Sequence, residues 1–168
     1  MNRKIICVVI AFFMVFCVSC NSEHNFSKVT KEIQKTINDF ESYRKDYTQK
    51  EIDTSNLIQS AEGSRATGYY NNLGILKFIE GNIYGEMGRK IYEIYIINES
   101  TIYLTITDLK YSKPIYESDY GIKEKGITKY VQIKGNLMFY NEKNDSLDSI
   151  KDESFIAEDL HTFLECQK

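Results

Sequence analysis

GILKFIEGNIYGEMGRKIYEIYIINESTIYLTITDL, residues 74–109, is the stretch that decides the fold class of this chain. β-branched and aromatic residues dominate it, and such residues favour strands. Gly85-Glu86-Met87-Gly88 and Asn98-Glu99-Ser100 interrupt the pattern with residue types that suit tight hairpins. Connections this short place neighbouring strands antiparallel. The stretch therefore predicts three strands of a meander, at about 74–84, 88–98 and 101–110.

The flanking sequence extends this meander in both directions. Strands are predicted at about 65–71, 126–134 and 136–142, which makes about six, and a long loop with the only proline is predicted at 111–125. Within 101–110, side chains alternate between an apolar set and a set of tyrosine and threonine. We therefore expect an antiparallel sheet with one dry face and one wet face.

A helix is expected on each side of the meander. Apolar residues recur every three or four positions from Phe26 to Tyr47, which predicts an amphipathic helix at about 27–49 that covers the dry face. Contact with a partner helix is the alternative use of that stripe. The segment SFIAEDLHTFLECQK, residues 154–168, predicts a short C-terminal helix. The fold class is α+β, and residues 27–168 form a single domain.

The first residues have the pattern of a secretory signal peptide. Arg3 and Lys4 precede 14 uncharged residues, Ile5–Val18, and a polar segment follows Cys20. This apolar run is too short to cross a bilayer, because a membrane helix needs about 20 apolar residues. We expect residues 1–19, including Cys7 and Cys17, to be removed from the mature chain.

Val18-Ser19-Cys20 resembles the lipobox of bacterial lipoproteins, although Cys17 stands where that motif usually has leucine. The resemblance implies cleavage before Cys20 and attachment of a diacylglyceryl group, with palmitate-like chains, to its sulfur. Two or more acyl chains hold a protein firmly at a bilayer. Residues 20–26 would then be a tether at the periplasmic or surface face of the bacterial cell envelope. Ordinary secretion and an uncleaved anchor are the alternatives.

The charge of the mature chain argues against a nucleic-acid partner. Loss of Arg3 and Lys4 lowers the basic residues from 21 to 19 against 24 acidic ones, so the net charge changes from −3 to −5. A nucleic-acid-binding domain shows a basic patch instead. We expect membrane contact through the lipid alone. Cys166 would be the single free thiol, without an intramolecular disulfide.

The sequence shows little that indicates catalysis, a metal or a cofactor. There are two histidines, His24 and His161, and the mature chain has neither metal-ligand spacing nor a phosphate-binding loop. We therefore predict a protein that is not an enzyme and needs no cofactor. The alternative is a small hydrolase that uses paired carboxylates as acid and base, such as Glu80 with Glu86 or Glu93.

Tyrosine is unusually common, with 13 in the chain and no tryptophan. Packing on a half-buried sheet accounts for many tyrosines. The functional hypothesis is a tyrosine-rich sheet face that binds a partner protein or glycan, because tyrosine is enriched at binding hot spots. Its candidate residues are Tyr92, Tyr95, Tyr103 and Tyr130.

The segment DSLDSI, residues 145–150, has two interpretations. A polar loop before the final helix is the interpretation we favour. The segment also resembles, twice in tandem, an O-glycosylation motif used by some bacteria on exported proteins, which would make Ser146 and Ser149 acceptors.

Three motifs between Glu62 and about Tyr116 resemble a family of small uncharacterised bacterial exported proteins. They are EGSRATGYY at 62–70, IYGEMG at 83–88 and KPIY at 113–116. The resemblance covers about a third of the chain and implies a β-meander and an envelope location, without an established activity. It also implies that Gly85 and Gly88 serve the hairpin turn, and it makes Glu86 a candidate binding residue.

Overall fold

The computed structural model describes residues 27–54, 60, 62–150 and 154–165. The chain divides into two compact units, Met1–Lys35 and Thr36–Lys168, and each is described by itself. In the first unit, the described residues 27–35 are helical. In the second unit, the helix continues to residue 43, and all other described elements follow it.

The second unit is an antiparallel sheet with helical segments at its two ends in sequence. After the helix come the 3-10 turn η1 (Arg44–Asp46), eight strands and helix α2 (Ser154–Glu165). The strands are β1 (Thr48–Ile52), β2 (Ser64–Tyr70), β3 (Leu76–Gly85), β4 (Gly88–Asn98), β5 (Thr101–Tyr111), β6 (Ile122–Ile133), β7 (Asn136–Asn141) and β8 (Ser146–Ser149).

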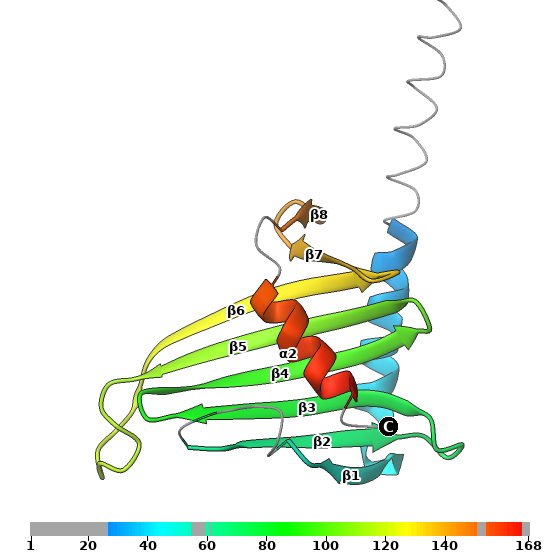
Figure 1. The fold of residues 1–168 in the computed structure, drawn as a ribbon. Coiled ribbons are helices and arrows are strands. Elements are labelled where there is room, and N and C mark those ends of the chain that lie inside the picture. Colours follow the sequence, from blue (N-terminus) through cyan, green and yellow to red (C-terminus); the bar gives the residue numbers. More distant parts are fainter. Residues whose placement is uncertain (1–26, 55–59, 61, 151–153, 166–168) are drawn as a thin grey trace, which may run out of the picture. The chain divides into compact units, whose positions relative to one another are not determined.

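The strands lie side by side in the order of the sequence, from β1 to β8, and every neighbouring pair is antiparallel (Figure 1). This confirms the predicted antiparallel meander of an α+β protein, with a helix before it and a short helix after it. The sheet has two more strands than the six that the sequence predicts. Gly74 and Gly135 adopt positive φ in the β2–β3 and β6–β7 turns, as expected for tight hairpins.

The register of the strands determines which side chains share each face of the sheet. On the tyrosine face, Tyr69, Phe78, Tyr95, Tyr103 and Val131 are directly opposite one another on β2 to β6. On the other face, which we call the apolar face, Ile79, Ile94 and Leu104 form a parallel row. Alternation along β5 therefore separates the two sets of side chains as predicted.

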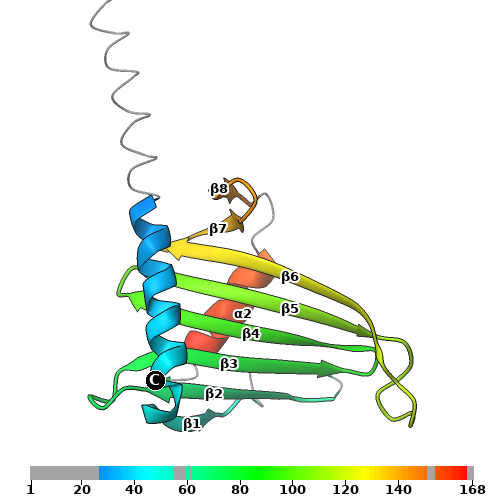
Figure 2. The same cartoon turned by 180° about the vertical axis from the view of Figure 1, so that it is seen from behind.

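Each face carries a helical segment, and residues 36–43 of the first helix lie on the face opposite to the one expected. Phe40 is 2% exposed, and its ring lies 4.4 Å from that of Phe78 and 5.5 Å from that of Tyr69 on the tyrosine face. The prediction that this helix covers the dry face is thus wrong. An aromatic face can bury a phenylalanine as effectively as an aliphatic one, because large rings supply most of the buried area. Figure 2 shows the sheet from this side.

Helix α2 packs across the apolar face (Figure 1). Leu160 and Phe163 are 1% and 0% exposed and belong to the same buried cluster as Tyr92 and Ile94. Gly81 makes room for Phe163, since a Cβ at Gly81 would lie 2.6 Å from the Cζ atom of the ring. The Phe163 ring therefore occupies the space that a side chain at position 81 would fill, and a larger residue there would displace the ring.

Several predicted boundaries need correction. The first helix ends at residue 43, six residues early, because Tyr47 is extended and Tyr43 is 59% exposed, so the apolar period continues beyond the packed stripe. Residues 48–52 form an edge strand instead of the end of that helix or a loop. Residues 146–149 are a strand rather than a polar loop, and β6 begins at Ile122 instead of 126.

Candidate functional site

The four tyrosines predicted to form one binding face do not lie on the same face of the sheet. Tyr95 and Tyr103 lie on the tyrosine face and are 5% exposed, whereas Tyr92, 1% exposed, packs against α2 on the apolar face. Tyr130 is half-buried and also lies on the apolar face, opposite Leu104. These side chains contribute to the core from both sides of the sheet, so in this structure they do not present one open binding face.

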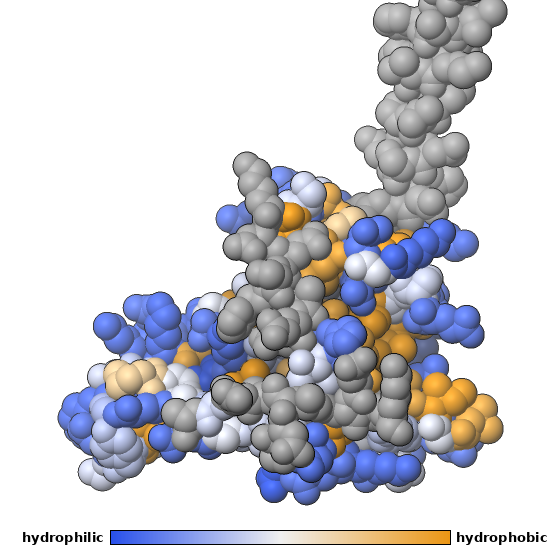
Figure 3. All heavy atoms as spheres, in the orientation of Figure 1, coloured by the Kyte–Doolittle hydropathy of each residue, from blue (hydrophilic) through white to orange (hydrophobic). Residues whose placement is uncertain are grey.

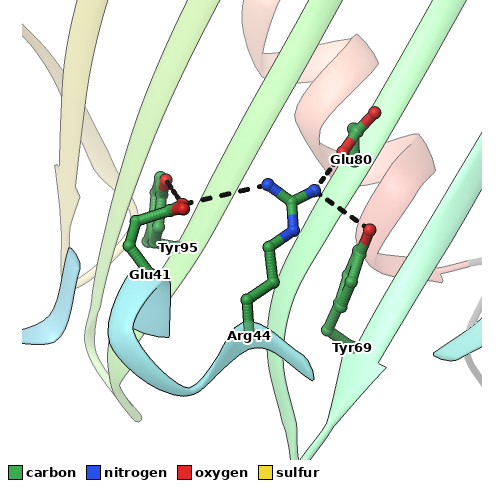
Figure 4. Close-up of polar contacts among 5 residues, drawn as sticks. All are labelled: Glu41, Arg44, Tyr69, Glu80 and Tyr95. Atoms are coloured by element: carbon green, nitrogen blue, oxygen red, sulfur yellow. Dashed lines mark hydrogen bonds and ion pairs between the residues drawn. The ribbon is translucent and has the colours of Figure 1, made fainter. Parts of the chain in front are cut away.

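A polar cluster surrounds Arg44, immediately after the first helix (Figure 4). Its Nη2 donates hydrogen bonds to the Oε2 of Glu80 at 2.5 Å and to the hydroxyl of Tyr69 at 3.0 Å. Its Nη1 lies 3.9 Å from Oε1 of Glu41, which also accepts a hydrogen bond from the hydroxyl of Tyr95 at 3.2 Å. The cluster joins the end of the helix to three strands of the tyrosine face.

Aromatic rings complete the surroundings of Arg44. Its guanidinium carbon lies 5.0 Å from the ring centroid of Tyr69, 5.5 Å from that of Phe78 and 5.6 Å from that of Phe40. Such cation–π contacts are attractive within about 6 Å. Burial opposes the charge of Arg44, but its contacts with Tyr69 and Glu80 outweigh that cost and raise its pKa. Arg44 is therefore best explained as a clamp that fixes the helix end.

Glu93 is the unbalanced charge beside this clamp. It is directly opposite Glu80 across β3 and β4, and it makes no ion pair with a described residue. Burial raises its pKa, the negative charges of Glu80 and Glu41 raise it further, and the smaller opposing effects of Arg44 and Lys125 do not cancel this rise. Burial and Glu93 also raise the pKa of Tyr95. The surroundings of the half-buried Glu93 therefore favour its neutral, protonated form.

The structure brings together one of the two predicted carboxylate pairs. Glu80 and Glu93 are cross-strand neighbours, as an acid and base pair requires. Glu86 lies instead in the β3–β4 turn at the far end of β3, so it does not pair with Glu80. Neither the open cavity beside Ile75 nor the one beside Glu51 is lined by Glu80 or Glu93.

Glu86 belongs to a second site, at the opposite end of the strands from the Arg44 cluster. The Tyr116 hydroxyl donates a hydrogen bond to Oε1 of Glu86 at 2.6 Å, which raises the pKa of that tyrosine. The backbone N–H of Ile115 donates to the carbonyl of Glu86 at 3.0 Å, and that of Tyr111 donates to Met87 at 2.8 Å. The segments IYGEMG and KPIY, separated in sequence, thus meet in space.

Gly88 allows this meeting of turn and loop. A Cβ at Gly88 would lie 2.4 Å from the carbonyl oxygen of Leu109, so the β3–β4 turn can approach β5 only with glycine there. Gly85 has no such constraint, because a Cβ there would lie 3.6 Å from the carbonyl oxygen of Gly88, which is an ordinary van der Waals contact. The implied need for glycine in this turn therefore applies to Gly88 more than to Gly85.

The loop at residues 112–121 is held by contacts of its own. Ser112 donates its backbone N–H to the carbonyl of Gly121 at 2.8 Å, and its hydroxyl accepts the N–H of Gly121 at 3.1 Å. Lys113 bonds to Asp119 at 2.6 Å, and the rings of Tyr111 and Tyr120 lie 5.2 Å apart. These hydrogen bonds, the ion pair and the ring contact stabilise one conformation of the loop.

This ordered end of the sheet exposes large apolar side chains. Tyr116 is 72% exposed, Ile122 62%, Met87 50% and Tyr120 44%. We call these four residues the distal tip. Figure 1 shows the loop that carries two of them at the left end of the sheet. Glu86 was predicted from the sequence but its contacts with Ile115 and Tyr116 were not, although both partners lie in the KPIY motif.

A further apolar area lies at the other end of the sheet (Figure 3). Leu73 is 77% exposed and Ile75 51% exposed in the β2–β3 turn. Beside them is an open cavity of about 480 Å³. Its apolar lining residues are Ile75, Leu76, Ile96, Ile102 and Leu164.

The remaining predicted sites have simple outcomes. Ser146 and Ser149 lie on β8 at the edge of the sheet, where Ser149 is exposed. Cys20 and Cys166 lie outside the described residues. Within the described ranges, no group of three or more His, Cys, Asp or Glu side chains is arranged to hold a metal ion. The same part of the chain contains no helix with the length and hydrophobicity needed to span a bilayer.

Comparison with known proteins gives no relative: the sequence matches no protein-family model, and no curated protein or solved structure shows significant similarity to it.

Proposed function

We propose that this chain is a lipid-anchored binding protein of the bacterial cell envelope that presents the distal tip to a partner and has no catalytic activity of its own. The leader and the cysteine at position 20 support the anchor. The observation that carries the binding role is the set of exposed apolar side chains on a braced loop. Binding residues are commonly found on loops that a rigid scaffold positions.

The residue types of the distal tip and the hydrogen bonds that hold its loop both suit binding of a protein or glycan partner. Tyrosine and methionine are enriched where proteins meet. Charged side chains, among them Lys113, Glu117 and Asp119, surround the exposed rings, as in the polar rim of an interface. Because the loop is already held by hydrogen bonds, little conformational entropy is lost on binding.

A capture experiment with matched variants tests the proposal. Tyr116→Ala with Ile122→Ser removes the two most exposed residues of the distal tip. Tyr43→Ala with Leu73→Ser is the control, because it removes a tyrosine and an aliphatic residue elsewhere that are also more than half exposed. We expect cross-linking in native envelope membranes to recover the same partner with the wild type and the control but not with the tip variant. Equal recovery with all three would contradict the assignment.

The alternative function is a small hydrolase that uses carboxylates on the sheet, favoured by the direct opposition of Glu80 and Glu93. We favour binding, since the Glu80 carboxylate is engaged by Arg44. Hydrolysis of a panel of glycoside and ester substrates that Glu93→Gln abolishes would favour the enzyme instead.

A further inference from the structure

The outer edge of β6 is only partly paired. β5 pairs with β6 along its length, from Ile122 to Ile133. On the other side, β7 pairs only with Tyr130–Ile133. Among the described residues, no strand lies against the outer edge at 122–129, and Figure 1 shows this edge open to the left of β7. Along these eight residues, a length of about 26 Å, the backbone N–H and C=O groups that point away from β5 therefore pair with no described strand.

This edge differs from the two ends of the sheet. β1 and β8 are the outermost strands and have five and four residues, and short edge strands are a common protection against unwanted pairing. The free part of β6 is longer than either. Its backbone N–H and C=O groups can accept one more strand, which is how several recognition domains bind extended peptides.

The side chains along this edge indicate which strand would be accepted. Lys110 bonds to Glu124 at 2.9 Å, so that acidic residue is already neutralised. Lys123 and Lys125 are exposed, and neither makes an ion pair with a described residue. Gly126 has open space beside it, and Ile127 is 54% exposed. The edge thus combines free backbone, an approachable glycine and two exposed lysines that form no ion pair with a described residue.

We propose that an extended acidic segment of a partner polypeptide adds to β6 as a further strand alongside residues 122–129. This rests on the proposed binding function and names the mode of recognition. Lysines on an edge repel neutral and basic strands, because burying their charge without a partner is costly. The same lysines attract a strand that carries carboxylates. Ile122 belongs both to this edge and to the distal tip, so one partner can contact both.

The experiment uses the full chain in detergent and a fluorescent ten-residue peptide of alternating glutamate and valine as the probe. One comparison peptide has lysine in place of glutamate, and another carries N-methyl groups that prevent backbone hydrogen bonds. The protein variants are Lys123→Glu with Lys125→Glu and, as a charge-matched control, Lys45→Glu with Lys143→Glu, two exposed lysines elsewhere. Anisotropy measures binding, and hydrogen exchange locates it.

We expect the acidic peptide to bind the wild type and the control equally, and the edge variant at least about fivefold more weakly, as loss of two surface ion pairs predicts. The lysine peptide should prefer the edge variant, and the N-methylated peptide should not bind. Amide exchange should slow within 122–129. Binding that ignores peptide charge or N-methylation, protection elsewhere, or no binding at millimolar peptide would overturn the inference.

Because Ile122 also belongs to the edge, the tip variant is made here with Met87→Ser in place of Ile122→Ser, and it then separates this inference from the proposed function. Edge binding of the peptide together with unchanged partner recovery by the tip variant would leave the inference standing and overturn the tip assignment. If the tip variant loses the partner and the acidic peptide shows no charge-dependent binding at the edge, the tip assignment stands and this inference is overturned.

Discussion

Replacing Glu93 by glutamine should stabilise the protein at neutral pH. Glu93 is half-buried, directly opposite Glu80 and near Glu41, and it has no ion-pair partner among the described residues. Directly opposite side chains on antiparallel strands are roughly 5–6 Å apart. At that separation and an effective dielectric constant of about 50, two like charges repel by about 1 kcal/mol. The amide removes this repulsion while keeping the shape of the side chain.

The gain should depend on pH in a defined direction. Burial and neighbouring carboxylates raise the pKa of Glu93 in the folded state, so the fold favours the neutral form. That favourable contribution is complete below about pH 4.5, the ordinary value, and is lost as the pH rises through the raised pKa. Glu93→Gln should therefore match the wild type near pH 4 and exceed it by about 1 kcal/mol, or about 3 °C in Tm, at pH 8.

Urea denaturation at four pH values measures the difference in unfolding free energy. Glu124→Gln is the control, because Lys110 lowers the pKa of Glu124 by a hydrogen bond and by charge. Its contribution is present above the ordinary pKa and is lost as the pH falls, which is the opposite trend. If Glu93→Gln were destabilising at pH 8, or its effect were the same at pH 4, Glu93 could not be the unbalanced charge described above.

Three further predictions concern other parts of the chain. Phe163→Ala should lower the free energy of unfolding by about 3–5 kcal/mol in urea, because the ring is fully buried against Gly81; a loss below 1 kcal/mol would refute the packing of α2. Gly88→Ala should cost about 1–3 kcal/mol by overpacking against Leu109 and speed amide exchange in the loop at 112–121; unchanged exchange would argue against the glycine's role. Cys20→Ala should leave an uncleaved, unlipidated chain by intact-mass spectrometry, and a wild type without added lipid mass would exclude the anchor.

The sequence predicts the central strands well because their pattern is enforced by burial. β5 alternates, and the turns that bound β4 and β5 contain asparagine and glycine, so the bounds of both strands agree closely with those predicted. β1 and β8 were missed because edge strands with mostly exposed residues need not alternate. The end of the first helix was misplaced because Tyr47 continues the helical period after the helix has stopped at residue 43.

The candidate site was harder to predict than the fold. Glu86 and Tyr116 are 30 positions apart, and their contact depends on how the loop at 112–121 folds back on the β3–β4 turn. No periodicity in a single sequence contains that information. The tyrosines illustrate the converse error, since an abundant residue type suggested a surface where the structure uses it for packing on both faces.

The order of the strands has a consequence for how the chain acquires its structure. Every strand pairs with its neighbours in sequence, so each hairpin loop closes over a short distance. The sheet can therefore form one hairpin at a time while the rest of the chain is still being synthesised. Contact of α2 with Gly81 closes a loop of about eighty residues and must wait for nearly the whole chain. We expect rapid hairpin formation followed by a slower final step, the docking of α2.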